Sequence, residues 1–560
     1  MEATTSQIPY LEKLDSSWQL WVDGKPFLIL GAELQNSSMS SARYMDGIWK
    51  NLVDMGINTV FGPVTWEDIE PEEGKFDFNE IEAVIASAKA YGLRLILLWF
   101  GSFKNGMSTY APSWVKKDAI RFPRMLLQGD TGKLTNSGVL SIFHSECLEA
   151  DLKAFAKLME YLKREDRYRT VIMVQVQNEV GLLGDSRDRS QVANDIFNAP
   201  VPGEIVKFIA EDWEALLPDF QNNFPGILKV IQKYASSPDI PDWKALFGDS
   251  EATDELFMAY HYALYLEKIA AEGKKIYDIP FFTNVWQKSP NADAVAGGGG
   301  TPGVYPSGGG VPEVLDIWQK FAPSLNCIAP DIYLNDYSAT LAKYRHRGQP
   351  LLIPEQRRDE YGARRIWEAF GTYQALAASP FGIDTLKAVN SPFTKHYKLL
   401  DSISHFVLKA QRNPNSMVGF FFDELQEDGS DLNPPRAIRM GKYDLKISRA
   451  FVFGTPGPGA GIVIQLESER FLLVGWGFKV EFKATSPRST LTGILRFDEK
   501  SVVDKVTGML RTERRLNGDE TRSGAWANMP NDQPDPGNIP IPITIPARTM
   551  IAEVSVFSLE

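Results

Sequence analysis

The sequence predicts an α/β fold, a (β/α)8 TIM barrel with a smaller C-terminal all-β domain. Three observations favour it. Predicted strands and amphipathic helices follow one another in turn, and the strands are continuous apolar runs in which polar residues do not alternate with apolar ones. After about Met417 the pattern changes to short strand-like runs separated by turns. Strands of that kind are typical of a parallel sheet that is buried on both faces. Because 560 residues exceed one ordinary domain, we expect a barrel with an N-terminal hairpin in residues 1–412 and a β-sandwich-like domain in residues 413–560.

The chain begins with a predicted hairpin. Residues 18–22 and 27–30 are apolar runs on either side of an Asp23-Gly24 turn. The second arm continues into residues 31–36 (GAELQN), which we predict as the first barrel strand. Apolar residues then recur at helical spacing over residues 48–53, and Gly56 ends that helix.

Strand–helix alternation then repeats along the first half. Helices are predicted over residues 81–88 and 148–162, the second with Ser145 as its N-cap. The intervening strands are predicted at residues 57–61, 93–100 and 171–179.

The second half holds four more predicted strands, at residues 280–286, 327–333, 351–356 and 378–384. Eight strand–helix units over roughly 400 residues fit a barrel with long loops. A doubly wound open sheet is the alternative, but no glycine-rich dinucleotide fingerprint follows the first strand.

A glycine-rich segment, residues 296–310, follows the fifth predicted strand. It is not a phosphate-binding loop, because no Gly-Lys-Ser/Thr follows it. We predict a flexible loop at the rim of the active-site face. Beyond it, short strand-like runs separated by Gly/Pro-rich turns indicate the all-β domain: residues 420–422, 450–453, 461–465, 471–475 and 550–557.

Composition excludes several classes of function. A formal net charge of −12 disfavours nucleic acid as a partner. The two cysteines and five histidines show no disulfide framework or metal-ligand spacing, so we expect no metal and no cofactor. No run of about 18 apolar residues indicates a membrane span. Because the N-terminus lacks a signal-peptide pattern, we expect a cytoplasmic protein, or a secreted one if a leader has been removed.

Two carboxylates stand at the ends of predicted buried strands. Glu179 closes the strand at residues 171–179, and Glu355 closes the strand at residues 351–356. The carboxyl ends of barrel strands build active sites, and an isolated charge is costly to bury without a function or a partner. A pair of carboxylates is what glycoside hydrolysis requires, one as acid and one as nucleophile. The pair therefore predicts a retaining glycosidase, although the acidic and basic residues that follow Glu355 also suit a structural ion-pair network.

Further residues near strand ends are candidates for a sugar pocket. Asn178 is placed to hydrogen-bond a sugar 2-hydroxyl, and Tyr333 is placed to donate to Glu355. Aromatic rings can stack on the C–H face of a sugar, although core packing is the common role of any single aromatic. The remaining candidates are Glu33, Asn36, Trp66, Trp99, Asn105, Trp114, Asn284 and Trp286, of which Trp286 and Glu33 rank first.

Several motifs resemble glycoside hydrolase family 35, a family of β-galactosidases. They are residues 56–61 (GINTVF), 66–78 (WEDIEPEEGKFDF) and 174–181 (VQVQNEVG), and the resemblance covers most of residues 20 to 385. It implies Glu179 as acid/base and Glu355 as nucleophile. The final region is similar to the short β-domain of a compact branch, some of whose members act on xyloglucan side chains.

The chain also departs from that pattern. Gln177 stands where larger members have Glu, and the residues after Glu355 differ from the common Glu-Tyr-Gly-Gly form. The first predicted strand lacks the histidine motif and the eighth lacks a Trp, so the terminal sugar stays open.

The expected activity is removal of terminal non-reducing β-D-galactosyl residues from oligosaccharides, including xyloglucan-type fragments. The alternatives are a glycosidase of the same clan with another sugar preference, and a barrel that binds sugar without hydrolysing it. We expect an oligosaccharide partner, no nucleic acid and no membrane. The oligomeric state is open, with a homodimer among the options.

Overall fold

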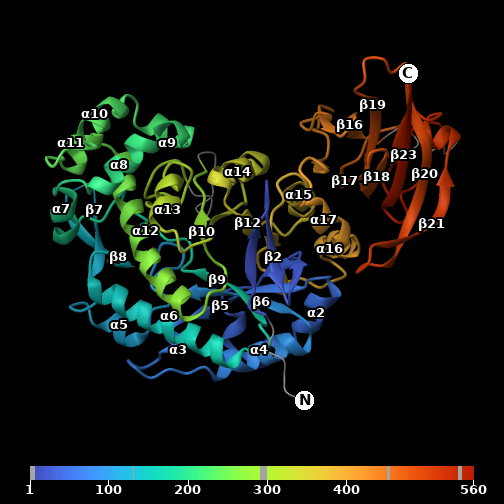
Figure 1. Cartoon of the computed structure of the whole chain (residues 1–560). Coiled ribbons are helices and arrows are strands. Elements are labelled where there is room, and N and C mark those ends of the chain that lie inside the picture. Colours follow the sequence, from blue (N-terminus) through green and yellow to red (C-terminus); the bar gives the residue numbers. More distant parts are fainter. Residues whose placement is uncertain (1–6, 130, 290–298, 451–453, 536, 540–544) are drawn as a thin grey trace.

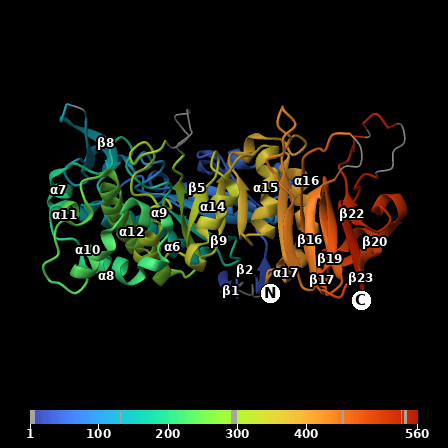
Figure 2. The same ribbon diagram turned by 90° about the horizontal axis from the view of Figure 1, so that it is seen from above.

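The fold is that of a computed structural model, which describes residues 7–129, 131–289, 299–450, 454–535, 537–539 and 545–560 (Figure 1). A barrel fills one side of the molecule, and the C-terminal sheets stand beside it (Figure 2). Among the described residues, none of the helices combines the length and apolarity needed to cross a membrane.

Eight parallel strands build the barrel. Six form one sheet in the order β11-β10-β9-β6-β5-β4, and two more form the sheet β12-β13. Their bounds are β4 (Gly31–Glu33), β5 (Thr59–Thr65), β6 (Arg94–Phe100), β9 (Val171–Val176), β10 (Phe281–Trp286), β11 (Cys327–Asp331), β12 (Leu352–Gln356) and β13 (Ala377–Pro380). All eight strands are buried at every residue or at all but one, and a strand with two buried faces does not need to alternate polar with apolar residues.

Two single parallel bridges close the ring. One joins Ile332 to Gln356 between β11 and β12, and the other joins Glu33 to Phe381 between β4 and β13. The Tyr397 hydroxyl also donates to carbonyls on both β4 and β13, at 2.6 and 2.9 Å. The predicted (β/α)8 arrangement is therefore present in the described residues.

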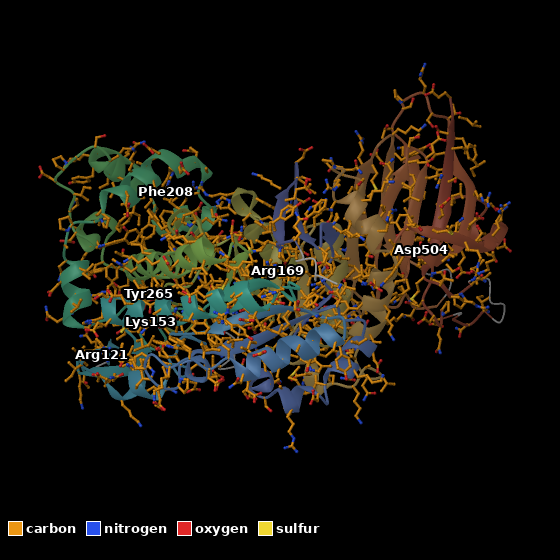
Figure 3. The ribbon with its side chains drawn as sticks, turned by 60° about the horizontal axis from the view of Figure 1, so that its bottom comes forward. Arg121, Lys153, Arg169, Phe208, Tyr265 and Asp504 are labelled. Atoms are coloured by element: carbon orange, nitrogen blue, oxygen red, sulfur yellow. The ribbon has the colours of Figure 1, made fainter. Side chains whose placement is uncertain are left out.

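A helix follows each barrel strand before the next strand begins. These outer helices are α2 (Trp49–Asp54), α4 (Asn79–Ala90), α6 (Ser145–Glu165), α12 (Glu251–Ile276), α13 (Leu315–Phe321), α14 (Tyr337–Tyr344), α15 (Glu360–Gly371) and α16 (Phe393–Ser402). Tyr265 of α12, labelled in Figure 3, packs toward the barrel, and its hydroxyl lies 3.0 Å from that of Ser102 after β6.

Insertions enlarge the barrel loops. They comprise α1 (Ala42–Met45), α3 (Trp66–Ile69), α5 (Ser113–Lys117), β7 (Arg124–Gln128), β8 (Leu134–Leu140), α7 (Gln191–Phe197), α8 (Gly203–Asp212), α9 (Pro218–Asn223), α10 (Ile227–Tyr234) and α11 (Trp243–Phe247). The sequence predicts neither these elements nor helix α12, because these segments between the expected strands carry no strong periodic signal.

The N-terminal hairpin gains a third strand, giving the antiparallel sheet β1 (Tyr10–Lys13), β2 (Trp18–Val22) and β3 (Lys25–Phe27). Leu20 and Val22 of β2 belong to the same apolar cluster as Ile96, Ile172 and Leu352 of the barrel strands. Because β3 leads directly into the start of β4, this sheet lies at the amino-terminal end of the barrel.

The C-terminal region consists of two packed antiparallel sheets. One is β14-β17-β18-β23-β20-β21 and the other is β15-β16-β19-β22, with an apolar core between them. Their bounds are β14 (Met417–Phe422), β15 (Arg436–Met440), β16 (Tyr443–Arg449), β17 (Gly459–Glu467), β18 (Arg470–Trp476), β19 (Phe478–Ala484), β20 (Leu491–Asp504), β21 (Met509–Leu516), β22 (Trp526–Met529) and β23 (Ile551–Leu559).

The two parts of the chain pack directly against each other. Helices α15, α16 and α17 (Ser404–Ala410) lie between the barrel and the sheets (Figure 1). Gly371 ends α15 against Gly419 of β14, where a Cβ on Gly371 would lie only 2.4 Å from the Gly419 nitrogen. The Thr372 hydroxyl donates to the Gly419 carbonyl at 2.6 Å. Such contacts hold the C-terminal sheets at a defined position on the barrel.

Several local predictions differ from the structure. His144, not Ser145, is the N-cap of α6, and the last barrel strand ends at Pro380 because residues 383–385 form a 3-10 turn. The glycine-rich segment is described only from residue 299 onward. From Tyr305 to Val314 it is buried, so that part is packed rather than a loose rim loop. The predicted strand at 450–453 lies outside the described residues except for Ala450.

Candidate active site

Carboxylates from four barrel strands converge at the carboxyl end of the barrel. Glu33 ends β4, Glu179 follows β9, Asp331 ends β11 and Glu355 lies near the end of β12, and all four are at most 7% exposed. Glu179, Asp331 and Glu355 each offer an oxygen within 4.8 Å of the other two. The strand ends therefore bring together the two carboxylates that the sequence paired and two further acids.

Asn284 of β10 stands at the centre of this cluster. Its Nδ2 donates to Oδ2 of Asp331 at 2.8 Å and to Oε1 of Glu355 at 3.3 Å. Its Oδ1 accepts from the backbone nitrogen of Glu179 at 2.9 Å. One buried amide therefore positions three of the acids. The sequence predicted Asn284 only as a candidate for the sugar pocket, whereas in the structure it holds the carboxylate cluster together.

The turn that presents Glu179 is held in a strained conformation. Gln177 and Glu179 have φ values of 62° and 44°, a region that side-chain-bearing residues seldom adopt. Gln177 is held by Asp151, whose Oδ2 accepts from its Nε2 at 2.6 Å, and by the Phe103 nitrogen, which donates to its Oε1 at 2.9 Å. The Gly106 nitrogen also donates to the Glu179 carbonyl at 3.0 Å. Strain of this kind costs on the order of 1–3 kcal/mol per residue and persists only where its surroundings enforce it.

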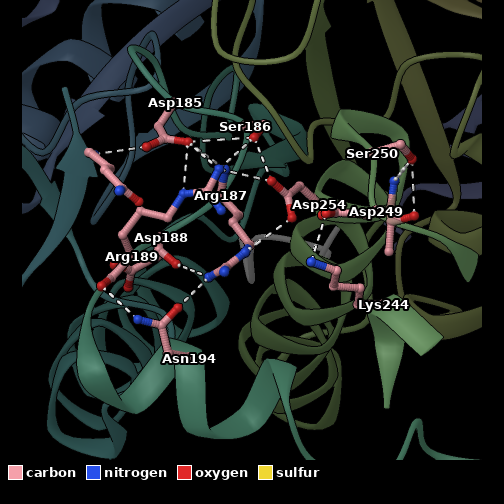
Figure 4. Close-up of polar contacts among 12 residues, drawn as sticks. Asp185, Ser186, Arg187, Asp188, Arg189, Asn194, Lys244, Asp249, Ser250 and Asp254 are labelled. Atoms are coloured by element: carbon pink, nitrogen blue, oxygen red, sulfur yellow. Dashed lines mark hydrogen bonds and ion pairs between the residues drawn. The ribbon is translucent and has the colours of Figure 1, made fainter. Parts of the chain in front are cut away.

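A network of charged side chains anchors the rest of this loop (Figure 4). Asp254 of α12 accepts from Arg187 at 3.0 Å, from Arg189 at 2.9 Å and from the Ser186 hydroxyl at 2.6 Å. Asp185 accepts a further bond from Arg189 at 2.7 Å. The loop after Glu179 is thus tied to the long helix beside it.

Tyr333 and Lys104 supply the electropositive side of the site. The Tyr333 hydroxyl donates to Oε2 of Glu355 at 2.8 Å. Lys104, only 6% exposed, lies in the loop after β6. Burial alone would lower the pKa of Lys104, but the charges of Glu355 and Glu179 raise it above its usual value. Lys104 therefore stays a cation among the acids.

Burial and mutual repulsion shift Glu33, Glu179 and Asp331 toward their protonated forms. The pKa of Glu179 is raised to about 7, first by burial and then by the charge of Glu355, while Lys104 opposes the shift. Burial also raises the pKa of Glu33 and of Asp331 well above the usual range, with the charge of Glu355 as the second cause. The cluster can thus hold protons at neutral pH.

A pocket of about 440 Å³ opens onto this cluster. Six of the predicted residues line it, namely Glu179, Glu355, Tyr333, Asn36, Asn105 and Trp286, together with Lys104, Asp331, Gln287, Leu334, Asn335 and Phe381. Its volume lies within the range of about 300–1,000 Å³ that is common for small-molecule sites.

Six predicted residues do not line the pocket, and one of them is Asn284 at the centre of the carboxylate cluster. Asn178 and Glu33 are fully buried beside it. Among the described residues the Asn178 amide has no hydrogen-bond partner, whereas the Glu33 carboxyl lies close to that of Glu355, whose charge helps to raise its pKa. Trp99 lies in the core, where its Nε1 donates to Asp151 at 2.9 Å, so it supports the Gln177 turn instead of contacting the pocket. Trp66 and Trp114 pack edge to face, with ring centroids 5.8 Å apart, outside the pocket.

Lys104 and Asp331 are site residues that the sequence did not predict. Asp331 lies inside the strand predicted at residues 327–333, two residues before Tyr333, a position that could have marked it. Lys104 carried no such signal, because a lysine in a loop is normally exposed. Glu179, Asp331 and Glu355 also have the spacing of cation ligands, and the expected absence of a metal stays a prediction.

Comparisons with known proteins point to β-galactosidases. Residues 39–201 match the model of glycoside hydrolase family 42, described as β-galactosidase, and residues 393–528 match a domain of unknown function, DUF5597. A β-galactosidase of Xanthomonas manihotis is 30% identical over 166 residues, 29% of this chain and 25% of that relative. The human β-galactosidase-1-like protein 3 is 33% identical over 167 residues, 29% of this chain and 23% of that relative. The chain thus spans about a quarter of the length of these relatives.

Among solved structures, the β-galactosidase of Bacillus circulans sp. alkalophilus aligns over 68% of this chain and 57% of its own, with 15% identity and a TM-score of 0.44. That of Marinomonas ef1 aligns over 67% and 60%, with 14% identity and a TM-score of 0.44. The match of residues 39–201 supports a glycoside hydrolase of the β-galactosidase kind, through a model of family 42 and not the family 35 expected from the motifs.

Proposed function

We propose that this protein is a retaining exo-β-galactosidase that releases terminal non-reducing β-D-galactosyl residues from oligosaccharides. The observation that carries the proposal is the approach of Glu179 and Glu355, whose nearest oxygens lie within 4.8 Å of each other. Retaining enzymes hold their carboxyl groups about 5–5.5 Å apart, whereas inverting enzymes need about 6.5–9.5 Å to admit a water molecule. The short separation favours retention.

In the first step, the Glu355 carboxylate attacks the anomeric carbon while Glu179 gives its proton to the departing glycosidic oxygen. The bond to the leaving group breaks as the Glu355–sugar ester forms. In the second step, Glu179 takes a proton from a water molecule that attacks the anomeric carbon, and the ester bond to Glu355 breaks. Two inversions yield net retention and restore both residues.

The electrostatics suit this exchange of roles. A pKa of about 7 keeps a large share of Glu179 protonated near neutral pH, as a general acid requires. Esterification of Glu355 would remove the charge that helps to raise the pKa of Glu179, so that pKa should fall and Glu179 can then act as a base.

The neighbouring residues have supporting roles in this proposal. Tyr333 and Asn284 hydrogen-bond Glu355 and fix the direction of its attack. Asn178, whose buried amide has no partner among the described residues, is assigned to a sugar hydroxyl, and Glu33, beside Glu355, is assigned to another. Asn36, Asn105 and Trp286 line the pocket and are assigned to the rest of the galactosyl ring.

The choice of galactose as the terminal sugar is supported by the β-galactosidase match of residues 39–201. We include xyloglucan-type fragments among the proposed oligosaccharide substrates. We also propose a division into a catalytic domain at residues 1–412 and a C-terminal domain at residues 413–560, near the start of β14 at Met417.

The test uses nitrophenyl glycosides and azide. Wild-type protein should hydrolyse the β-galactoside, and Glu355→Gly should lose that turnover and recover it with azide as an α-galactosyl azide. A β-galactosyl azide from Glu179→Ala would assign the acid/base. If the wild-type protein hydrolyses only another glycoside, the terminal sugar is not galactose, and if it hydrolyses none, a sugar-binding protein is favoured. Near-normal rates in either variant would refute the assignment of Glu179 as acid/base and Glu355 as nucleophile.

A further inference from the structure

A second cavity, of about 920 Å³, lies between the barrel and the C-terminal sheets. The barrel contributes Asp336, Tyr361 and Arg365 to its lining, and the C-terminal region contributes Phe421, Leu432 and Asn433. We call this cavity the interdomain groove. Neither part of the chain forms it alone.

Ion pairs across the domain boundary brace its walls. Arg365, 4% exposed, donates from both terminal nitrogens to Asp423, at 3.0 and 2.7 Å. Its guanidinium lies 3.1 and 4.2 Å from the ring centroids of Tyr361 and Phe421. Glu368 of α15 pairs with Arg436 of β15 in the same region. The groove is therefore a built feature of the interface and not a loose gap.

The interdomain groove adjoins the catalytic pocket. Tyr333, Leu334 and Asn335 line the pocket, and the next three residues, 336–338, line the groove. On the next strand–helix unit, Glu355 lines the pocket and Tyr361, in the first turn of α15, lines the groove. Two successive strand–helix units at the carboxyl end of the barrel therefore contribute residues to both cavities.

The lining combines apolar surface with neutral and acidic hydrogen-bonding groups. Leu334 and Leu432 are 56% and 70% exposed at the mouths of the pocket and the groove. Asn433 Oδ1 accepts from the Asp423 nitrogen and Asp336 Oδ1 from the Ala339 nitrogen, each at 2.7 Å, so the Asn433 amide nitrogen and the second Asp336 oxygen are the groups that they offer to a ligand. Arg365 is already paired with Asp423. Arg436, the other arginine of the described lining, is paired with Glu368, so an anionic ligand would meet no unpaired arginine among these described residues. A neutral sugar, with apolar C–H faces and many hydroxyls, fits this lining.

We propose that the interdomain groove binds the leaving-group chain of an oligosaccharide, as a run of neutral sugar units attached to the galactosyl residue in the catalytic pocket. This inference rests on the proposed function and extends it: the C-terminal domain selects substrates with a long neutral chain beyond the cleaved bond. Short galactosides occupy the catalytic pocket only.

The first experiment compares two substrates of the full-length protein, 4-nitrophenyl β-galactoside and a β-galactosyl-terminated tetrasaccharide with neutral sugars. Ala437→Trp fills the groove from its C-terminal wall, and Leu432→Glu places a charge at its mouth. Each should lower kcat/KM for the tetrasaccharide at least about tenfold and change that for the nitrophenyl substrate by less than about twofold. The matched control Leu495→Glu changes a leucine of similar exposure, 68%, on β20 away from the groove and should alter neither value.

An unchanged ratio of the two kcat/KM values in both groove variants would overturn the proposal. A second arm works without catalysis: calorimetry of wild-type protein with the trisaccharide that lacks galactose. We expect binding that Ala437→Trp abolishes and Leu495→Glu retains. No binding, or equal binding by Ala437→Trp, contradicts the groove. Binding by a protein that hydrolyses no glycoside would refute the proposed function and leave the groove as a sugar site.

Discussion

The Tyr333 hydroxyl donates a 2.8 Å hydrogen bond to Oε2 of Glu355, from a residue just past the end of β11 to one on β12. The two residues are neighbours only because these strands lie side by side. The bond orients the carboxylate of Glu355, one oxygen of which attacks the anomeric carbon in the proposed mechanism.

Removing that hydroxyl should slow catalysis. A hydrogen bond to a charged group is worth about 1.5–3 kcal/mol, so Tyr333→Phe should lower kcat by about 10- to 150-fold with a smaller change in KM. The matched control is Tyr337→Phe, because the Tyr337 hydroxyl donates at 2.7 Å to Gln356, the residue after Glu355. Steady-state kinetics with nitrophenyl galactoside distinguishes the two variants; equal losses would show that Tyr333 acts only through packing.

Activity should fall as pH rises through about 7. The pKa of Glu179 is raised to about 7, and the proposed acid works in its protonated form, which is present below that pH and lost above it. A profile of kcat/KM against pH should show this basic limb in wild-type protein. Glu179→Gln should lose most activity and the limb with it; a limb of unchanged position in that variant would assign it to another group.

Lys104 should set the position of that limb. Its charge lowers the pKa of Glu179, so Lys104→Met should raise that pKa and move the basic limb to higher pH. Lys116→Met is a suitable control, because Lys116 pairs with Glu67 at the protein surface. The idea fails if the limb of Lys104→Met stays in place or moves to lower pH while the protein remains folded.

Asp254→Asn should destabilise the protein. Asp254 is 8% exposed and contacts two arginines, so loss of its charge leaves Arg187 and part of Arg189 without compensation. Breaking such a buried pair costs about 3–5 kcal/mol, and the remaining Arg189–Asp185 pair favours the lower end. Urea unfolding measures the change. Asp212→Asn removes a pair whose aspartate side chain is 38% exposed and should cost about 1 kcal/mol or less.

Chelation should leave activity unchanged. The oxygens of Glu179, Asp331 and Glu355 have the spacing of cation ligands, but Lys104 already supplies a positive charge beside them. We expect equal rates before and after dialysis against EDTA, measured with nitrophenyl galactoside. A loss of rate that added divalent metal restores would instead make the cluster a metal site.

Much of the barrel could be predicted because its signals are local. Residues 93–100 and 171–176 are apolar runs that fit strands buried on both faces, and β6 and β9 lie there. The helices of the long insertion at residues 191–247 could not be predicted, because they are short and no predicted strand lies between them to mark where each begins and ends. Trp99 looked like a pocket residue from its place near a strand end, but its indole points away from the pocket, to Asp151.

The sequence by itself determined which strands end in chemically active side chains: Glu179, Glu355 and Tyr333 were all recognisable from apolar runs and the residues that close them. Only the tertiary structure decided that Glu179 and Glu355, 176 positions apart (355 minus 179), approach within 4.8 Å, and that Lys104 and Asp331 join them. The raised pKa of Glu179 and the interdomain groove also depend on residues that are distant in sequence and meet only in the folded chain. Distances and burial depend on how the ring of strands closes and how the C-terminal sheets pack against it, and no local pattern encodes either.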